Sequence, residues 1–487
     1  MKNLTAKAHK DETHKSACFY LVLVSCVLAM HSFVAPSGVR ARQRPAPQGG
    51  ATAVGEDVVT LLRAAIELLQ AGRLDEAEPL LRRAARLAPT NADAHGLLGA
   101  LLDQRGRAGD AEREFQTALR LNPRHLSARA NLGVLLAHTG RADEAIKLFE
   151  SVLRDAPDYP QATFNLGVQY AARGDYERAA PLLTRARAQQ PTNVTVLYQL
   201  AVTLLQLKRL DEAAEVLASA SALAPDHPDV LYALGLVAAA RGDDEAAADF
   251  WQRALVARPN FAAANFMLGE ALRRHRRWEG AAEFYERALA QDPAQLIHYV
   301  RLGGTYMLLV RYDRALEIFQ RAAARFPAVA EAYYFVGIAA RGRAMSDVAE
   351  AALRRSLALK ADDVDALAQL GSIVGDGGRY EEAERLLRRA SALGVGHFYA
   401  HYDLGRLLVK TRRYEEAIPI LQRAAAIRSN SPDVHYQLFL AFTRLKRKED
   451  ADRELAVFKR LDEERKARGR NEDELDDPPA DNSPPPL

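Results

Sequence analysis

The sequence predicts an all-α protein in which helical hairpins stack one after another into a solenoid. Two observations carry this prediction. A pattern of small and apolar residues recurs at one fixed spacing along almost the whole chain, as is typical of stacked helical units. The 487-residue chain is 48% apolar but only 7% aromatic, and its long stretches of Ala, Leu, Arg and Glu favour helices over strands. Most of the chain should therefore fold.

Charge and cysteine content exclude several classes of function. The chain has 66 Lys and Arg against 63 Asp and Glu, a net charge of +3, so nothing global directs it to nucleic acid. We therefore expect no nucleic-acid partner. Its two cysteines, Cys18 and Cys26, lie in one N-terminal apolar run, which rules out a disulfide framework or a cysteine zinc site in the repeats.

Three positions define the repeat. An alanine recurs at intervals of 34 without insertion or deletion: Ala77, Ala111, Ala145, Ala179, Ala213, Ala247, Ala281, Ala315, Ala349, Ala383, Ala417 and Ala451. Four residues after each alanine comes a large apolar residue: Leu81, Phe115, Phe149, Leu183, Leu217, Trp251, Tyr285, Phe319, Leu353, Leu387, Leu421 and Leu455. Twelve residues before most of the alanines there is a glycine, as in Gly99 and Gly133, which lets two helices approach closely.

Each repeat is expected to be a hairpin of two helices. In the unit 126–159, apolar residues recur at helical spacing in two runs, separated by a turn at 139–143. A proline closes the first eight units and stops the second helix: Pro89, Pro123, Pro157, Pro191, Pro225, Pro259, Pro293 and Pro327. One such hairpin cannot bury its apolar face alone, so neighbouring hairpins must stack.

These positions resemble the tetratricopeptide repeat, and the resemblance covers twelve repeats over residues 58–465. It implies a right-handed α-solenoid, a superhelix of helix-turn-helix units that binds other proteins. The later units depart from the pattern, since Ala361, Val395 and Ser429 replace the closing proline and Phe439 replaces the glycine. We expect the last unit to be a cap with altered packing.

Residues 1–41 do not follow the repeat and resemble a secretory signal or an N-terminal membrane anchor. Four lysines precede an apolar run at 17–35, and Val39-Arg40-Ala41 resembles a cleavage motif that would leave a chain starting at Arg42. The run could also span a bilayer uncleaved, or be lipidated at Cys26. A cleaved signal, an uncleaved anchor and a lipidated Cys26 would each place the repeats outside the cytoplasm, in the periplasm, in the medium or tethered to the membrane. The fourth alternative is a cytosolic protein.

The two remaining segments have biased compositions. Residues 42–57 are rich in Pro, Gly and Ala and are expected to be a flexible linker. Residues 466–487 are acidic and then proline-rich, which predicts a disordered tail.

No catalytic pattern is found in the sequence. It contains no phosphate-binding glycine loop, no H-E-x-x-H and no G-x-S-x-G motif. His397, His401 and His435 are the best metal candidates, but no carboxylate completes their set, so packed or exposed histidines are the simpler interpretation. We predict that the protein is not an enzyme and has no cofactor or metal.

The resemblance implies that the first helix of each hairpin lines a concave groove, and two chemistries occur at the lining positions. Aromatic residues occupy the fifth position of four consecutive units: Phe164, Tyr198, Tyr232 and Phe266. They predict an apolar strip able to hold a peptide, or else inter-repeat core.

Further along the chain, the lining positions become basic: Arg273, Arg274, Arg341, Arg406, Lys410 and Arg444. Arginine suits carboxylates, so this half would bind an acidic peptide or an anionic glycan; a solvated charged face is the alternative. The expected function is a binding scaffold of the cell envelope with a protein or peptide partner. Help with exopolysaccharide assembly or secretion is the alternative function.

Overall fold

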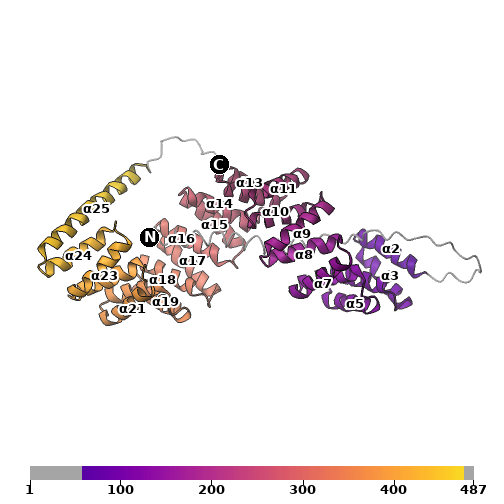
Figure 1. Ribbon diagram of the computed structural model, residues 1–487, viewed down its shortest axis with the longest axis horizontal. Helices are drawn as coiled ribbons and strands as arrows, with labels where there is room; N and C mark the ends of the chain where they lie inside the picture. The colour runs from indigo at the N-terminus through magenta and orange to yellow at the C-terminus, as the bar shows by residue number, and fades with distance from the viewer. Residues whose placement is uncertain (1–56, 476–487) are drawn as a thin grey trace, which may run out of the picture. The chain divides into compact units, whose positions relative to one another are not determined.

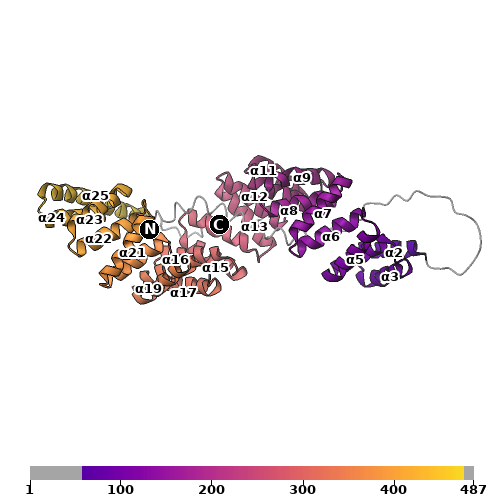
Figure 2. The ribbon, with the colours of Figure 1, turned by 60° about the horizontal axis from the view of Figure 1, so that its bottom comes forward.

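The computed structural model describes residues 57–475, including the side chains of residues 57–467. Every regular element in this range is an α-helix, and the 24 helices form twelve successive pairs (Figures 1 and 2). The predicted signal or anchor at 1–41 lies outside the described residues, as do the predicted linker at 42–57, apart from its last residue, and the tail from 476. Within the described range, no helix is both long and apolar enough to cross a membrane.

The first helices of the pairs are equal in length and begin at the same position of every repeat. These helices are α2 (Val58–Gln70), α4 (Ala92–Gln104), α6 (Leu126–His138), α8 (Pro160–Ala172), α10 (Val194–Gln206), α12 (Pro228–Ala240), α14 (Ala262–Arg274), α16 (Leu296–Leu308), α18 (Ala330–Gly342), α20 (Val364–Asp376), α22 (Phe398–Lys410) and α24 (Pro432–Arg444).

The second helices of the first eleven pairs are also equal in length, and each is one residue longer than the first helices. These second helices are α3 (Leu74–Leu87), α5 (Ala108–Leu121), α7 (Ala142–Asp155), α9 (Tyr176–Gln189), α11 (Leu210–Leu223), α13 (Asp244–Ala257), α15 (Trp278–Gln291), α17 (Tyr312–Arg325), α19 (Ser346–Leu359), α21 (Tyr380–Leu393) and α23 (Tyr414–Ile427), followed by the longer α25 (Lys448–Leu475). The predicted solenoid of helix-turn-helix repeats is therefore confirmed.

The three positions that define the repeat form the core. All twelve alanines are buried, and so are eleven of the twelve large residues that follow them; only Leu455, in the last repeat, is half-buried. The glycines lie directly against these large side chains. A Cβ atom on Gly303 would come within 2.5 Å of the Phe319 ring, and one on Gly235 would overlap the Trp251 indole. Nine of the twelve hairpins therefore close with a large side chain packed directly on a glycine, and Ala65, Ala201 and Phe439 take the glycine's place in the others.

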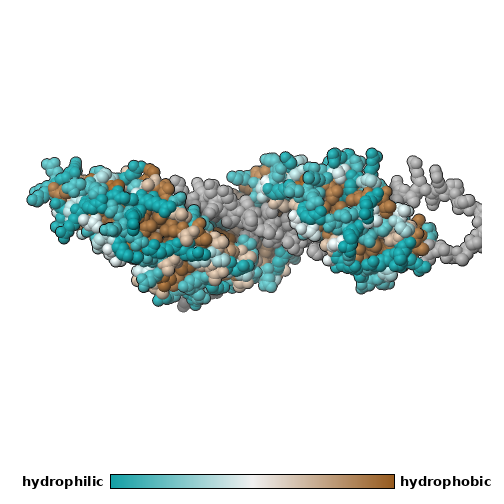
Figure 3. All heavy atoms as spheres, turned by 90° about the horizontal axis from the view of Figure 1, so that it is seen from below, coloured by the Kyte–Doolittle hydropathy of each residue, from teal (hydrophilic) through white to brown (hydrophobic). Residues whose placement is uncertain are grey.

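The chain divides into two compact units, one up to Ala264 and one from Asn265 onward. The division falls within α14. Each unit has its own stacked repeats, and the face of each that is seen in Figure 3 is mostly hydrophilic with apolar patches.

The last helix differs from the expected boundary at residue 465. Helix α25 continues to Leu475, so residues 466–475, expected to be disordered, are helical. Charged side chains spaced three and four residues apart support the start of this extension, as in the pairs of Asp462 with Arg465 and with Lys466. The amino-acid composition of this segment indicated disorder because composition takes no account of how the charged residues are spaced along a helix.

Candidate binding surface

The first helices form the inner wall of each unit. In both units, successive first helices contact one another in several places, as α10 and α12 do in the first unit and α20 and α22 in the second. Among the helix pairs described, the second helices instead contact the first helices that flank them. Elements on the inside of a curved stack lie closer together, so a partner following the curve would meet the first helices.

In the first unit, the predicted aromatic strip is largely buried. The side chains of Tyr198 and Tyr232 are only 8% and 4% exposed, whereas Phe164 is half-buried. The Tyr232 ring packs 5.1 Å from Phe261 in the loop before α14, and burial raises the pKa of the Tyr232 hydroxyl. This burial favours inter-repeat core over a ligand surface for the two tyrosines.

Phe266, the fourth aromatic of the strip, belongs to the second unit and is also buried. Its ring lies 5.6 Å from Tyr285 and 5.3 Å from His298, which places it in the core between α14, α15 and α16. Phe164 is therefore the only one of the four that is not buried.

Amide side chains connect the inner wall of the first unit. Gln161 of α8 donates a hydrogen bond to Asn131 of α6 at 2.9 Å, and Asn165 donates to the Gln161 carbonyl at 2.8 Å. The inner wall of this unit thus carries polar but uncharged side chains next to Phe164.

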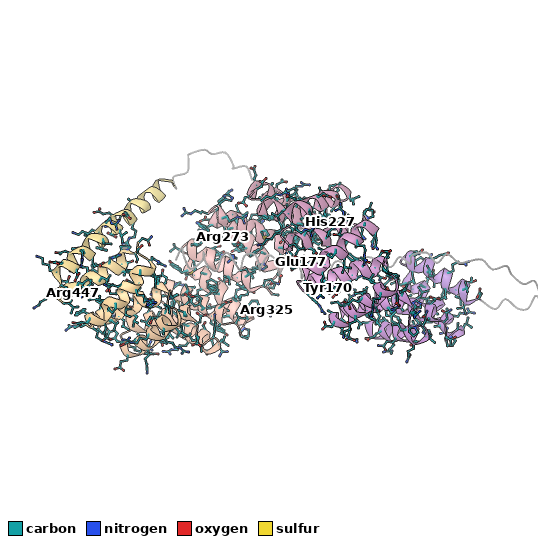
Figure 4. All side chains as sticks on the ribbon, in the orientation of Figure 1. Tyr170, Glu177, His227, Arg273, Arg325 and Arg447 are labelled. Atoms are coloured by element: carbon teal, nitrogen blue, oxygen red, sulfur yellow. The ribbon has the colours of Figure 1, made fainter. Side chains whose placement is uncertain are left out.

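The basic residues of the second unit do not act as one surface. Arg273, labelled on α14 in Figure 4, donates to the buried carboxylate of Glu270 at 3.1 Å. Arg301 of α16 donates to the same carboxylate at 2.8 Å, and the Tyr285 hydroxyl does so at 2.5 Å. Burial would raise the pKa of Glu270, but Arg301 and Arg273 outweigh it and hold that pKa below its usual range. Arg273 is therefore committed to an internal network.

Arg341, Arg406 and Lys410 are brought together on α18 and α22, on either side of α20. Arg341 donates to Ser372 Oγ at 3.2 Å, and Arg406 donates to the same atom at 3.1 Å. Lys410 donates to the Gly375 carbonyl at 3.3 Å. Arg274 and Arg444 are exposed at the ends of α14 and α24 and lie outside this cluster.

A shallow hollow lies beside this cluster, between α20 and α22. Its polar lining is Ser372, Asp376, Asp403, Arg406 and Lys410. Asp403 is 3.4 Å from Arg406, and Asp376 is 3.2 Å from it. Burial raises the pKa of Asp403 to about 6, against the opposing effect of Arg406.

The three histidines considered for a metal have structural partners. His397 caps α22 by accepting from the Ala400 amide and lies 2.9 Å from Asp365. His401 bonds the Val395 carbonyl, and His435 lies against Glu454. Within the described range, no group of three or more potential ligands could hold a metal ion.

A recurring set of ion pairs between neighbouring repeats was not predicted from the sequence. The fourteenth residue of several repeats is an arginine that pairs with an aspartate of the repeat before: Arg105 with Asp75, Arg173 with Asp143, Arg241 with Asp211 and Arg343 with Asp313. Arginines and aspartates in a fixed register of the repeat were the signal that could have revealed them.

Two profiles of the tetratricopeptide repeat family match the chain, one over residues 68–120 and 170–237, the other over 102–160, 232–295 and 368–432. Together they cover more than half of the sequence, and the chain belongs to this family. Repeats of this family mediate protein–protein interactions and are generally not enzymes. No curated protein sequence matches the chain significantly.

Several solved structures are similar in fold. Yeast Tom70 is 15% identical, with 80% of this chain and 96% of that one covered and a TM-score of 0.35. PilF of Pseudomonas aeruginosa is 19% identical, with coverages of 44% and 97% and a TM-score of 0.41. YrrB, described as a repeat protein with an unusual peptide-binding site, is 22% identical, with coverages of 39% and 97% and a TM-score of 0.33.

Proposed function

We propose that the protein is a non-enzymatic scaffold that binds a peptide or protein segment along the inner wall of its repeats. The observation that carries the proposal is the inner wall of the second unit. There, cationic side chains from separate repeats converge beside a hollow open to solvent. An extended or helical segment lying across several first helices would meet a few anchoring groups, which supply most of the affinity in such interfaces.

The proposed location is the cell envelope, with the repeats outside the cytoplasm. Support comes from the sequence alone, namely the lysines before the apolar run at 17–35 and the motif ending at Ala41. The intact mass of the protein from its native cells, together with its cell fraction, tests this. A mature start at Arg42 in a soluble extracytoplasmic fraction, or an intact start in the membrane, supports it; an intact start in the cytosol contradicts it.

Site-specific photo-crosslinking in native cells tests the binding surface. A photoreactive amino acid replaces Phe164 or Arg444 on first helices, and Arg113 or Arg385 on the exposed faces of second helices α5 and α21 serves as the matched control. We expect protein adducts from the inner positions and few from the control positions. Equal adducts at all four positions, or none at the inner ones, would contradict an inner-wall scaffold.

A further inference from the structure

One buried hydroxyl in the second unit accepts hydrogen bonds from two guanidinium groups. Ser372 on α20 is 2% exposed, so its oxygen is held in place. Arg341 from α18 and Arg406 from α22 each donate to it, at 3.2 and 3.1 Å. A hydroxyl is neutral, and hydrogen bonds from a cation to a carboxylate are about twice as strong as those between neutral groups. Two cations thus share an acceptor weaker than the one that arginine prefers.

The two arginines differ in how their charge is balanced. Arg406 forms ion pairs with two carboxylates, Asp376 at 3.2 Å and Asp403 at 3.4 Å. Arg341 donates only to neutral side chains, those of Gln369 and Ser372. It makes no ion pair with any carboxylate in the described part of the chain, and it is exposed. Its positive charge is therefore available to a ligand.

Lys410 adds a third cation on the same helix face as Arg406, four residues later. Its ammonium group bonds the Gly375 carbonyl and lies 5.2 Å from the centre of the Tyr380 ring, so its contacts are also neutral. Three cations then face two carboxylates, Asp376 and Asp403. The cluster keeps a net positive charge beside an open hollow.

Arg341 contrasts with the other arginines of the repeats. Arg273 is bound to Glu270, and the arginines at the fourteenth repeat position each pair with an aspartate of the preceding repeat. Arginine in this protein thus commonly has a carboxylate partner. Arg341 has no carboxylate at ion-pair distance in the described part of the chain, and the carboxylate whose charge acts on it, Asp403, forms its ion pair with Arg406.

We propose that Arg341 and Arg406 bind a carboxylate group of an acidic side chain in the partner segment, with Lys410 as a supporting cation. The carboxylate would accept hydrogen bonds from the guanidinium group of Arg341. It would also accept from Arg406, which already pairs with Asp376 and Asp403. The apolar lining of the hollow comes from Leu387 and Leu407 rather than from aromatic rings, which suits the aliphatic part of a glutamate better than a sugar ring. This inference rests on the proposed scaffold function and specifies the chemistry of its ligand.

Fluorescence anisotropy with the full chain tests the proposal, using fluorescein-labelled hexaglutamate as the probe and hexaglutamine as the neutral probe at low salt. Arg341→Gln should weaken hexaglutamate binding about tenfold, equivalent to about 1.4 kcal/mol. Arg341→Gln with Arg406→Gln should weaken it further, and Arg341→Lys should retain part of the affinity. Arg385→Gln removes the same charge from an exposed position on α21 and should change the affinity less than about twofold.

Three results would overturn the assignment. Hexaglutamate that fails to bind the wild-type protein, or that binds the double variant equally well, would exclude a carboxylate site here. Tighter, arginine-dependent binding of polygalacturonate would assign the site to an anionic glycan instead. Because Arg341 is exposed and its partners are neutral, its variants should fold normally, which circular dichroism checks.

The failure of this site is separable from failure of the scaffold function. If Arg341→Gln leaves both hexaglutamate binding and crosslinking from Arg444 unchanged, the scaffold stands without the carboxylate site. If the wild-type inner wall gives no adducts, the scaffold itself fails.

Discussion

The two units build the same hairpin from different turn residues. Up to residue 264, the fifteenth residue of the repeat is glycine in all repeats but one, which has Lys208: Gly72, Gly106, Gly140, Gly174 and Gly242. In the second unit glycine remains only at Gly378, and the other turns use Arg276, Val310, Ala344, Arg412 and Lys446. All twelve have a positive φ, in the region that favours glycine. Six residues other than glycine therefore adopt a backbone conformation at the turns that they intrinsically disfavour.

The closing proline leads to the same conclusion. The last repeats have Ala361, Val395 and Ser429 in its place, yet their second helices α19, α21 and α23 end at the same repeat position as the others. What both units share is the core of glycine, alanine and large apolar residue. This core, rather than the turn residues or the closing prolines, therefore determines the backbone of the repeat.

The most damaging change should be to that core, and by a similar amount in both units. Gly235→Ala in the first unit and Gly303→Ala in the second push a methyl group into Trp251 and Phe319. Each should destabilise its repeat by about 3 kcal/mol, the upper part of the range for overpacking. Hydrogen exchange of the helix pairs α12–α13 and α16–α17 measures this locally. A loss of stability in only one unit would contradict the conclusion that the same core determines the repeat backbone in both units.

Two buried aspartates on first helices should respond with opposite signs. Asp229 accepts two hydrogen bonds from Arg258, at 2.9 and 2.7 Å, so Asp229→Asn should cost about 2 kcal/mol in the first unit. Asp403 is buried, and its pKa is raised to about 6. Asp403→Asn should therefore stabilise the second unit at pH 7.5, by about 2 kcal/mol.

The sign of the Asp403 effect follows from proton binding. Its pKa is higher in the folded state than in the unfolded chain, so the folded state binds more protons and loses stability as the pH rises from about 4 through 6. Arg406, Arg341, Asp376 and His397 are the charged or titratable groups that act on it. Thermal unfolding of Asp403→Asn should match wild type near pH 4 and exceed it at pH 7.5. A gain independent of pH would contradict this account.

A smaller effect is expected at the turns. Val310 is a β-branched residue at φ 58°, so Val310→Gly should relieve strain and stabilise the second unit by about 1 kcal/mol. The reverse change, Gly174→Val at φ 76°, should destabilise the first unit by about 1–2 kcal/mol. Denaturant unfolding compares the two. If both substitutions were neutral, the turns would carry no strain to distinguish the units.

The smallest effect should come from the recurring ion pairs. Arg173 and Arg343 pair with Asp143 and Asp313, whose side chains are well exposed. Arg173→Ala and Arg343→Ala should each change stability by less than about 0.5 kcal/mol, because water and salt screen exposed pairs. Thermal unfolding at low and high salt checks this. A loss above about 1 kcal/mol would show that the repeated pairs contribute to stacking.

The sequence predicted the fold far better than the site. The repeat period determines every helix start because the same core positions recur without a gap, and Gly303 and Phe319 meet as that pattern requires. The inner wall was less predictable, since a long side chain can find its partner on its own helix or in another repeat. Arg273 and Arg341 occupy the same repeat position, yet the first meets Glu270 and the second meets Ser372 of the next repeat.

The burial of Trp251 makes the first unit optically distinct. The chain has two tryptophans, and Trp251 is fully buried on α13, where its indole nitrogen donates to the Tyr232 carbonyl at 3.2 Å. Trp278, at the start of α15, is only partly buried. In a Trp278→Phe variant, the emission spectrum would follow the opening of the first unit alone, while circular dichroism would follow both units together.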